Sequence, residues 1–418
     1  MPLLDVVDRD AMLHVQAAEE YALFNSTSSV TLESFMIKKN DNCGNFRCTT
    51  LSSPTGRGAL YGAFRLLMLL QRGVETLPTL IEDTPRSRLR IWQGWDNVDG
   101  TIERGYGGRS IFHFEELPAV MRPRYAAYAR LLASVGLNAI SLTNVNACER
   151  GNERLLDNAH IAKAARLAAT FARYGLSTFL TPCYASPMLI GGLPTADPLD
   201  TSVRHWWVTS AATTAAEFAA ATRPRSVDQY PYPSPSPFGG YLIKADSEGE
   251  PGPGNYNRSE PEGASVLADA LRPFGGLVLW RAFTHPGNLG RNSTRADQPL
   301  AQYTHFKALD GLWPANVVLQ IKNGPMDFQV HEPVHSLFGK IEHTNVLLEL
   351  GVAHEYTGQA WHLAHLPAQW SSYLGFDTRC GGHLPLWRVV TEGSGYGFAG
   401  VSNFGEDQSW TGHLMSAA

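Results

Sequence analysis

Three apolar segments in the second half of the chain each end at a cation. The cations are Lys244, Arg281 and Lys322. One such residue is usually solvated at the surface, with its stem lying on apolar neighbours. Three that meet at the same end of neighbouring strands repel one another unless an anion or carboxylates lie between them. The pattern therefore predicts a pocket for an anionic ligand.

Three carboxylates lie just beyond predicted strands of the same region. Glu248 lies on a loop rich in glycine and proline, and Asp327 and Glu355 each follow a later apolar run. Carboxylates that converge on one opening suit general acid and base catalysis. They suit a structural network with the three cations equally well, and the residue pattern leaves both interpretations open.

Aromatic residues add a third component to this candidate site. Trp95, Phe112 and Phe114 follow the first predicted strand of the region. Flat rings stack on sugars, although aromatic residues near strands are more often part of the core. Cations, carboxylates and rings together favour a glycosidase for an acidic sugar. No metal is expected, because the four histidines between residues 331 and 354 are not spaced as a ligand cluster.

Eight short apolar runs alternate with helical stretches from residue 86 onward. The runs cover residues 88–95, 137–143, 176–183, 240–245, 276–283, 316–322, 344–352 and 397–403. Helical spacing separates several of them, over 124–135, 160–174 and 203–220. Such alternation is typical of parallel β/α units, and eight units fit a (β/α)8 TIM barrel. An open doubly wound sheet is disfavoured, because no glycine-rich dinucleotide or phosphate-binding motif follows an early run.

The chain is expected to divide into two parts. Residues 1–85 would form a reduced N-terminal α/β domain, and residues 86–418 the catalytic barrel. Within the first part the spacing predicts a helix over 12–23, a strand over 30–38 and a helix over 58–70. The proline-rich segment 230–237 is expected to lie on the surface as an extended insertion.

The composition is that of a mildly acidic globular chain of 418 residues. Lys and Arg number 34 against 39 Asp and Glu, so the net charge of −5 argues against a general affinity for nucleic acid or acidic membranes. No stretch approaches the roughly 20 apolar residues of a membrane helix, and the start lacks a secretory core, so a cytoplasmic location is expected. The five scattered cysteines argue against a disulfide framework.

Several long motifs of the chain resemble those of the family 67 α-glucuronidases. They include WDNVDGTIERGYGGRSIF over 95–112, KADSEGEPGP within 238–253, and QIKNGPMDFQ over 320–329. Shorter motifs lie at 143–147, 195–200, 280–283, 355–359 and 410–413. The resemblance runs from about residue 56 to the end of the sequence. It implies removal of glucuronic acid or its 4-O-methyl ether, α-1,2-linked to the terminal xylose of xylan fragments, with inversion and without a metal or cofactor.

The resemblance also implies a role for each candidate carboxylate. Glu248 would be the general acid that protonates the departing xylose oxygen, and Asp327 and Glu355 would activate water from the opposite face. Which of the latter two is the base stays open, since neighbouring carboxylates titrate together. An inverting enzyme needs roughly 6.5–9.5 Å between acid and base to leave room for that water.

The remaining site residues are expected to bind the substrate, a small aldouronic acid. Lys244, Arg281 and Lys322 would hold the uronic acid through its carboxylate and hydroxyls. Further contacts are expected from Trp95, Phe112, Phe114, Asn144 and Asn146. One conflict follows, because a general acid needs a raised pKa whereas nearby cations lower it. The expected resolution is that the substrate's own carboxylate neutralises the cations.

The sequence also departs from the family pattern. The family usually has a larger N-terminal domain and a helical C-terminal domain, so the chain is expected to be truncated at both ends, and a homodimer is not expected. Related sequences often have tryptophan where Phe112 or Phe114 stands. Two alternatives stay open: a barrel hydrolase for another acidic sugar, and an inactive or binding-only homologue.

Overall fold

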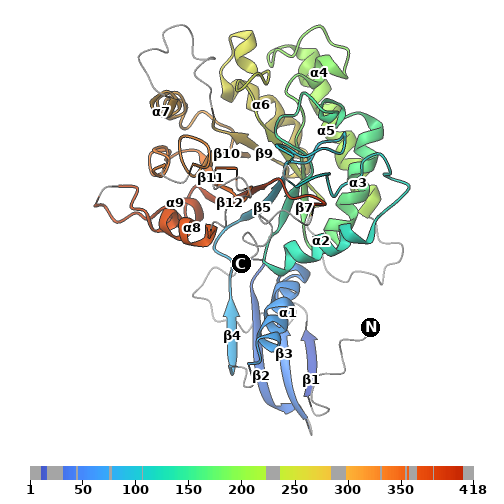
Figure 1. Cartoon of the computed structure of the whole chain (residues 1–418), viewed down its shortest axis with the longest axis vertical. Helices are drawn as coiled ribbons and strands as arrows, with labels where there is room; N and C mark the ends of the chain where they lie inside the picture. Colours follow the sequence, from blue (N-terminus) through green and yellow to red (C-terminus); the bar gives the residue numbers. More distant parts are fainter. Residues whose placement is uncertain are drawn as a thin grey trace.

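The computed structural model of the chain contains two separate β-sheets with helices packed against them (Figure 1). The structure describes residues 11–16, 32–43, 46–74, 78–105, 107–222, 236–283, 298–329, 332–353, 355–356, 365–379 and 381–407. The larger sheet is a closed barrel, and the smaller has four strands. In this part of the chain no helix combines the length and apolarity that a membrane span requires.

The smaller sheet has the strand order β1-β3-β2-β4. Its elements are β1 (Ala11–Gln16), β2 (Phe35–Cys43), β3 (Phe46–Ser52), β4 (Leu80–Asp83) and the helix α1 (Gly56–Gln71). Strand β1 is parallel to β3, whereas β2 is antiparallel to both β3 and β4. The prediction of a helix over 12–23 was wrong for residues 12–16, because residues 11–16 pair with residues 47–52 as a strand; residues 17–23 lie outside the described residues. The predicted helix over 58–70 is confirmed.

The barrel closes in the order in which its eight parallel strands follow along the chain. The strands are β5 (Leu89–Gly94), β6 (Ala139–Ser141), β7 (Ser177–Leu180), β8 (Phe238–Ile243), β9 (Leu277–Arg281), β10 (Val317–Lys322), β11 (Asn345–Gly351) and β12 (Gly395–Ser402). All eight predicted runs are confirmed as these strands. The (β/α)8 prediction therefore holds, and the open-sheet alternative falls away.

Helices surround the barrel, as Figure 1 shows. They are α2 (Pro123–Ser134), α3 (Asn158–Ala172), α4 (Ser186–Leu189), α5 (Thr201–Thr222), α6 (Glu260–Leu271), α7 (Gln298–Ala308), α8 (Leu366–Gly375) and α9 (Leu386–Thr391), with short 3₁₀ turns at Asn152–Arg154, Pro253–Tyr256 and Arg272–Phe274. Side-chain caps fix the start of α3, where Asp157 accepts from the N–H of His160, and of α6, where Ser259 and Glu262 form a capping box. Most of the proline-rich segment 230–237 lies outside the described residues.

Alternate strand residues point into the barrel or out toward the helices. The interior is a packed cluster whose members come from all eight strands or the loops that follow them, among them Ile91, Phe179, Leu242, Leu279 and Leu347. The opposite faces of the strands pack against the helices in a larger cluster. Because both faces are apolar, the polar residues of the strands concentrate at their ends.

The small sheet contacts the barrel at the N-terminal ends of the strands. The carboxylate of Glu33 pairs with Arg57 and with Arg90 near the start of β5. The hydroxyl of Tyr61 donates to the carbonyl of Leu137, just before β6, at 2.9 Å. This contact lies at the end of the barrel opposite to the residues that follow the strands.

Gly240 permits a close approach of β8 to β9. It has a φ of +131°, and a Cβ atom there would lie 1.9 Å from the carbonyl oxygen of Leu277. We expect Gly240→Ala to destabilise the barrel by about 2–5 kcal/mol, through backbone strain and overpacking. The midpoint of urea denaturation measures this effect.

Gly73 provides the matched control. Its φ is +67°, but no atom would lie within 4 Å of an added Cβ. Gly73→Ala should therefore show only the strain of about 1–2 kcal/mol for a left-handed residue. Equal midpoints for the two variants would contradict the packing argument.

Candidate active site

The three predicted cations lie at the C-terminal ends of three adjacent barrel strands. Lys244 follows β8 directly, Arg281 is the last residue of β9, and Lys322 is the last residue of β10. All three are buried, with relative exposures of only 5%, 5% and 6%. A buried cation is costly unless an opposite charge compensates it.

Each of the three cations has a carboxylate partner. Lys244 Nζ lies 2.6 Å from Glu248 Oε2, and Lys322 Nζ pairs with Asp327 Oδ1. Lys322 Nζ also lies 3.6 Å from the ring centroid of Phe283. The charges of Lys322 and Arg281 act on both Glu248 and Asp327. The structure therefore brings these predicted residues together at one end of the barrel.

Arg281 has a partner that the sequence did not single out, Glu349 on β11. Two nitrogens of the guanidinium donate to the two oxygens of Glu349, at 2.9 and 2.6 Å. Glu349 is fully buried and also accepts from Gln320, which in turn bonds Gln93. One signal was available in the sequence, because Glu349 is a lone charge inside an otherwise apolar strand.

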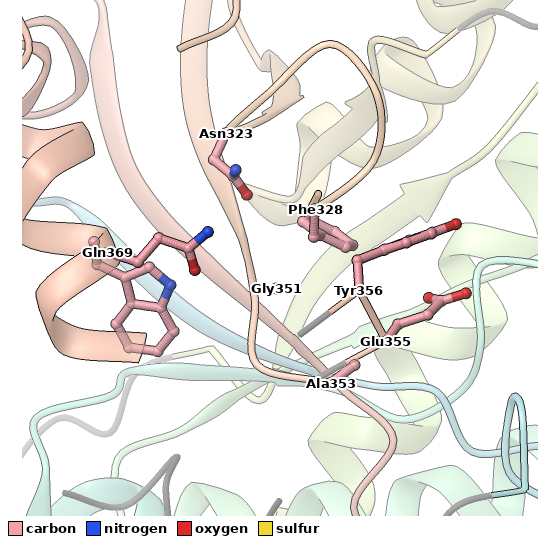
Figure 2. Close-up of a pocket in the computed structure, with 8 residues that line it drawn as sticks. Asn323, Phe328, Gly351, Ala353, Glu355, Tyr356 and Gln369 are labelled. Carbon is pink, nitrogen blue, oxygen red and sulfur yellow. The ribbon is translucent and has the colours of Figure 1, made fainter. Parts of the chain in front are cut away.

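Asp327 and Glu355 are neighbours that differ in their partners. Asp327 Oδ2 accepts from the hydroxyl of Tyr356 at 3.1 Å, and Glu355 Oε1 lies 2.5 Å from Nε of Arg104. Figure 2 shows Glu355 and Tyr356 extending side by side, away from Gln369. Sequence reasoning missed Tyr356 and Arg104 as site residues, although both lie within the quoted motifs.

A small cavity lies beside Glu355 and Tyr356 (Figure 2). Its volume is about 10 Å³, and it is lined by Asn323, Phe328, Glu355 and Tyr356, among others. A single water needs about that much space. The cavity is therefore too small for a sugar ring.

The surroundings lower the pKa of two of the three carboxylates and raise that of the third. Burial raises the pKa of Glu248, but Lys244, Lys322 and Arg281 together bring it below its usual value. Asp327 behaves in the same way, because Lys322 and the Tyr356 hydroxyl outweigh its burial. The pKa of Glu355 is raised, because burial and the charge of Asp327 exceed the opposing effect of Arg104. The predicted conflict at Glu248 is therefore present in the ligand-free chain.

The two predicted asparagines belong to the loop after β6. Asn146 Oδ1 accepts from Lys244 Nζ at 2.6 Å. Asn144 is buried, and its amide donates to Glu103 at 2.7 Å. Asn146 therefore lies directly at the cation cluster, whereas Asn144 holds the residue beside Arg104.

The three predicted aromatic residues fall in two places. Trp95 lies at the end of β5, where it packs near Phe328 with a centroid distance of 6.4 Å. Phe112 and Phe114 are each only 1% exposed, and the ring of Phe112 packs against Tyr125 in the core beneath α2. The expectation that these two phenylalanines stack on substrate needs correction, because buried rings present no free face to a sugar.

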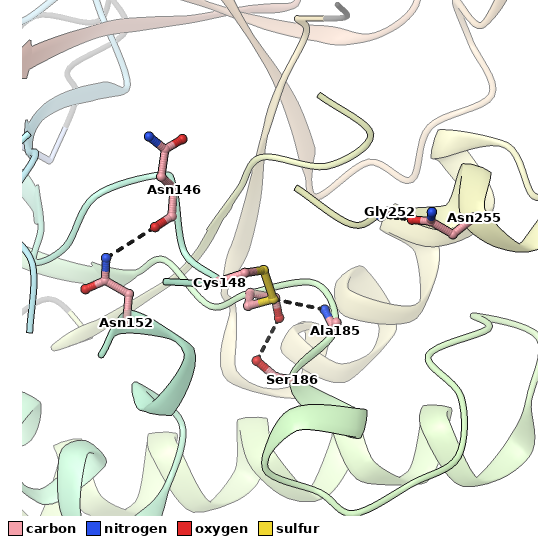
Figure 3. Close-up of a disulfide and its surroundings, with 8 residues drawn as sticks. Asn146, Cys148, Asn152, Ala185, Ser186, Gly252 and Asn255 are labelled. Atoms are coloured by element: carbon pink, nitrogen blue, oxygen red, sulfur yellow. Dashed lines mark hydrogen bonds between the residues drawn. A yellow bond between two sulfur atoms is a disulfide. The ribbon is translucent and has the colours of Figure 1, made fainter. Parts of the chain in front are cut away.

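Two of the five cysteines form a disulfide, although their number and scatter argued against a disulfide framework. Cys148, after β6, and Cys183, after β7, form a disulfide (Figure 3). With Glu250 they are the one group of His, Cys, Asp and Glu residues in the described ranges with the spacing of a metal site. Neither sulfur is a free thiolate, so this group does not offer the ligands that zinc or iron would need.

The site and the fold together define a TIM-type barrel with paired charges at its C-terminal end. The model of the glycosyl hydrolase family 67 middle domain matches residues 69–410, and the chain belongs to this family. It is 40% identical over 364 residues to the probable alpha-glucuronidase A of Aspergillus clavatus. It is also 40% identical over 365 residues to the alpha-glucuronidase A of Aspergillus tubingensis. Each match covers 86% of this chain and 41% of the relative, so the chain spans about two fifths of the length of these curated relatives.

Solved structures share the fold at low identity. One is a GH138 enzyme targeting pectin rhamnogalacturonan II, with a TM-score of 0.51 and 12% identity over 96% of this chain and 42% of that one. Another is CpGH84B, with a TM-score of 0.52 and 12% identity over 95% of this chain and 58% of that one. At this identity the likeness supports the barrel fold alone.

The buried pair of Arg281 and Glu349 allows a stability test. We expect Glu349→Gln to destabilise the protein by about 3–5 kcal/mol, because it leaves a buried guanidinium without its counter-charge. Chemical denaturation measures the loss. The exposed pair Arg388 and Glu392, 2.9 Å apart, is the control, and Glu392→Gln should change stability by less than about 0.5 kcal/mol. Similar losses in both variants would mean that the inner pair is not desolvated.

Proposed function

We propose that the chain is a glycosidase that releases glucuronic acid, or its 4-O-methyl ether, from the terminal xylose of xylo-oligosaccharides with inversion. The observation that carries this proposal is the mixed cluster at the barrel end. Three buried cations lie beside Glu248 on one loop and beside Asp327 and Glu355 on two others. The names of the matched relatives, which cite alpha-glucuronidase, support the same substrate class.

The cations would select the uronic acid. Lys244 and Lys322 each carry three N–H donors, and their present partners lie toward solvent, with Glu248 45% and Asp327 30% exposed. A sugar carboxylate that enters the opening meets two ammonium groups and the field of Arg281. A neutral hexose has no carboxylate to pair with these ammonium groups, so it would bind with less favourable free energy.

The reaction we propose divides the work between two faces of the sugar. Glu248 gives its proton to the glycosidic oxygen as the C1–O bond breaks. A water oxygen attacks C1 from the opposite face, and Asp327 or Glu355 accepts the water's proton. The products are β-glucuronic acid and the shortened xylo-oligosaccharide, and the enzyme returns to its starting state when the protons re-equilibrate with solvent.

The substrate itself would resolve the protonation conflict. Lys244 holds Glu248 in its ionised form in the free chain, because its charge lowers the pKa of that carboxyl. A substrate carboxylate that binds Lys244 offsets that positive charge, so the pKa of Glu248 rises and its protonated form becomes available. The proposal thus links recognition of the acidic sugar to the readiness of the acid.

The compartment and the oligomeric state stay predictions. A cytoplasmic location was expected from the sequence. The Cys148–Cys183 disulfide weighs against it, because cytosolic thiols are kept reduced in most cells. The tests below distinguish the proposed enzyme from two alternatives, a binding-only homologue and a hydrolase for another uronic acid.

Proton NMR of the released sugar tests the chemistry most directly. With an aldouronic acid as substrate, we expect the β-anomer of glucuronic acid to appear first and to mutarotate afterwards. A galacturonic acid analogue is the control for sugar identity and should be cleaved at least tenfold more slowly. Initial α-anomer would overturn the proposed water attack, and binding without turnover would favour a binding-only homologue.

Arg104 allows the base side to be tested through pH. Burial and Asp327 raise the pKa of Glu355, and Arg104 opposes them. Removing that cation in Arg104→Gln should raise the pKa of Glu355 further. The base must be ionised to accept a proton, so activity should be lost at a higher pH when the medium is acidified. We expect the acidic limb of the kcat/KM profile to move upward by about half a pH unit, since the arginine is half exposed.

Two variants control for this shift. Arg104→Lys keeps the charge and should restore most of the original limb. Arg150→Gln removes an equally exposed arginine, also at positive φ, whose nearest carboxylate is Glu149 at 3.9 Å. A limb that stays in place in Arg104→Gln would exclude Glu355 as the titrating base and favour Asp327.

A further inference from the structure

The disulfide joins two of the loops that form the catalytic end of the barrel. Cys148 lies in the loop after β6 and Cys183 just after β7. Around it, Ser186 donates to the carbonyl of Cys183 at 2.7 Å, and the amide of Asn152 donates to the carbonyl of Asn146 at 3.3 Å (Figure 3). The loop after β6 is therefore fixed both covalently and by hydrogen bonds.

A first path leads from the disulfide to the candidate acid through Lys244. Asn146, two residues before Cys148, accepts a hydrogen bond from Lys244 Nζ at 2.6 Å. The same nitrogen lies 2.6 Å from Glu248 Oε2. Lys244 Nζ therefore links Asn146 to the carboxylate of Glu248.

A second path leads through Glu250, two residues beyond the candidate acid. One of its carboxylate oxygens and the two sulfur atoms lie within 4.8 Å of one another. Burial raises the pKa of Glu250 to about 7, although the nearby backbone N–H groups of Cys148 and Ala147 act to lower that pKa. Glu250 therefore contacts the cross-linked loop directly.

The turn between these two paths carries Glu248. The N–H of Glu250 donates to the carbonyl of Ser247 at 3.0 Å, and Glu248 itself has a φ of +51°. Glu248 is 45% exposed, so packing alone does not hold it. Its position depends on Lys244 on one side and on the anchored Glu250 on the other.

We propose that the Cys148–Cys183 bond and Glu250 act as a clamp that positions Glu248 for proton transfer. This inference rests on the proposed function and adds positioning residues to it. Reduction by a dithiol opens the clamp: the S–S bond breaks, the two sulfurs take up two electrons and two protons, and the reagent becomes a cyclic disulfide. Turnover that needs the acid then slows, whereas turnover that does not need it continues.

The test compares two substrates that differ in their leaving group. An aldouronic acid needs protonation of its xylose oxygen, whereas α-glucuronyl fluoride loses fluoride with little help from an acid. After reduction with dithiothreitol, confirmed by mass spectrometry, we expect kcat for the aldouronic acid to fall by about tenfold or more, since small misplacements of a reacting group are costly. The rate with the fluoride should change by less than twofold.

Three variants complete the kinetic test. Cys148→Ser combined with Cys183→Ser should reproduce the reduced protein and show no further response to dithiothreitol. Glu250→Ala leaves the disulfide intact and should give the same selective loss. Glu248→Gln should lose aldouronic acid turnover whether or not the disulfide is reduced. An equal loss with both substrates would mean that the bond only stabilises the fold, and no loss would mean that it does not reach the acid; either result overturns the clamp.

A second measurement separates failure of the clamp from failure of the proposed function. Should the oxidised protein cleave neither substrate, the proposed function fails. Amide hydrogen exchange then tests the clamp without turnover: reduction should speed exchange over residues 245–251 as well as 144–149. Faster exchange over 144–149 alone would overturn the clamp.

Discussion

The removal of three cations from water at one end of the barrel constrains the rest of the site. Lys244, Arg281 and Lys322 are all nearly inaccessible, and moving such a group out of water costs several kcal/mol even after relaxation. The fold is compatible with these charges because a carboxylate stands within contact of each. Arg281 on β9 pairs across β10 with Glu349 on β11, whereas Lys244 and Lys322 pair with carboxylates of the loops that follow their own strands.

The three cations differ in how deeply their carboxylate partners are buried, and this difference decides which partners a ligand could replace. Arg281 is matched by Glu349, which is inside the barrel wall and cannot leave. Lys244 and Lys322 are matched by Glu248 and Asp327, which stand at the opening. A ligand carboxylate can replace the outer partners but not the inner one. The inner pair therefore supplies a fixed framework, and under the proposed function the outer pairs are the positions that an acidic sugar would occupy.

The sequence predicted this arrangement where position along a strand determines position in space. All eight barrel strands were found, and with them the ends at which the three cations meet.

Glu349 was missed, because a charge within an apolar strand gives no sign of which neighbour it faces. Phe112 and Phe114 follow a strand, but they pack in the core with α2 and α3, so proximity in sequence did not place them at the opening. A helix was predicted over 12–23, yet residues 11–16 pair with β3, because a neighbouring strand can override local preference. The disulfide joins residues 35 positions apart, which only the pairing of β6 with β7 brings together.

The two ends of the barrel make different contacts, with the small sheet at one end and the charged cluster at the other. Glu33 joins Arg57 and Arg90 where the strands begin, so the small sheet supports the barrel from the end remote from the cations. Loops at the other end are free of that task and can hold strained residues such as Glu248 and Asp327, both at positive φ. Strain of this kind persists only where the surroundings hold it, and here the surroundings are the ion pairs themselves. The ion pairs that neutralise Lys244 and Lys322 therefore also contribute to the positions of Glu248 and Asp327.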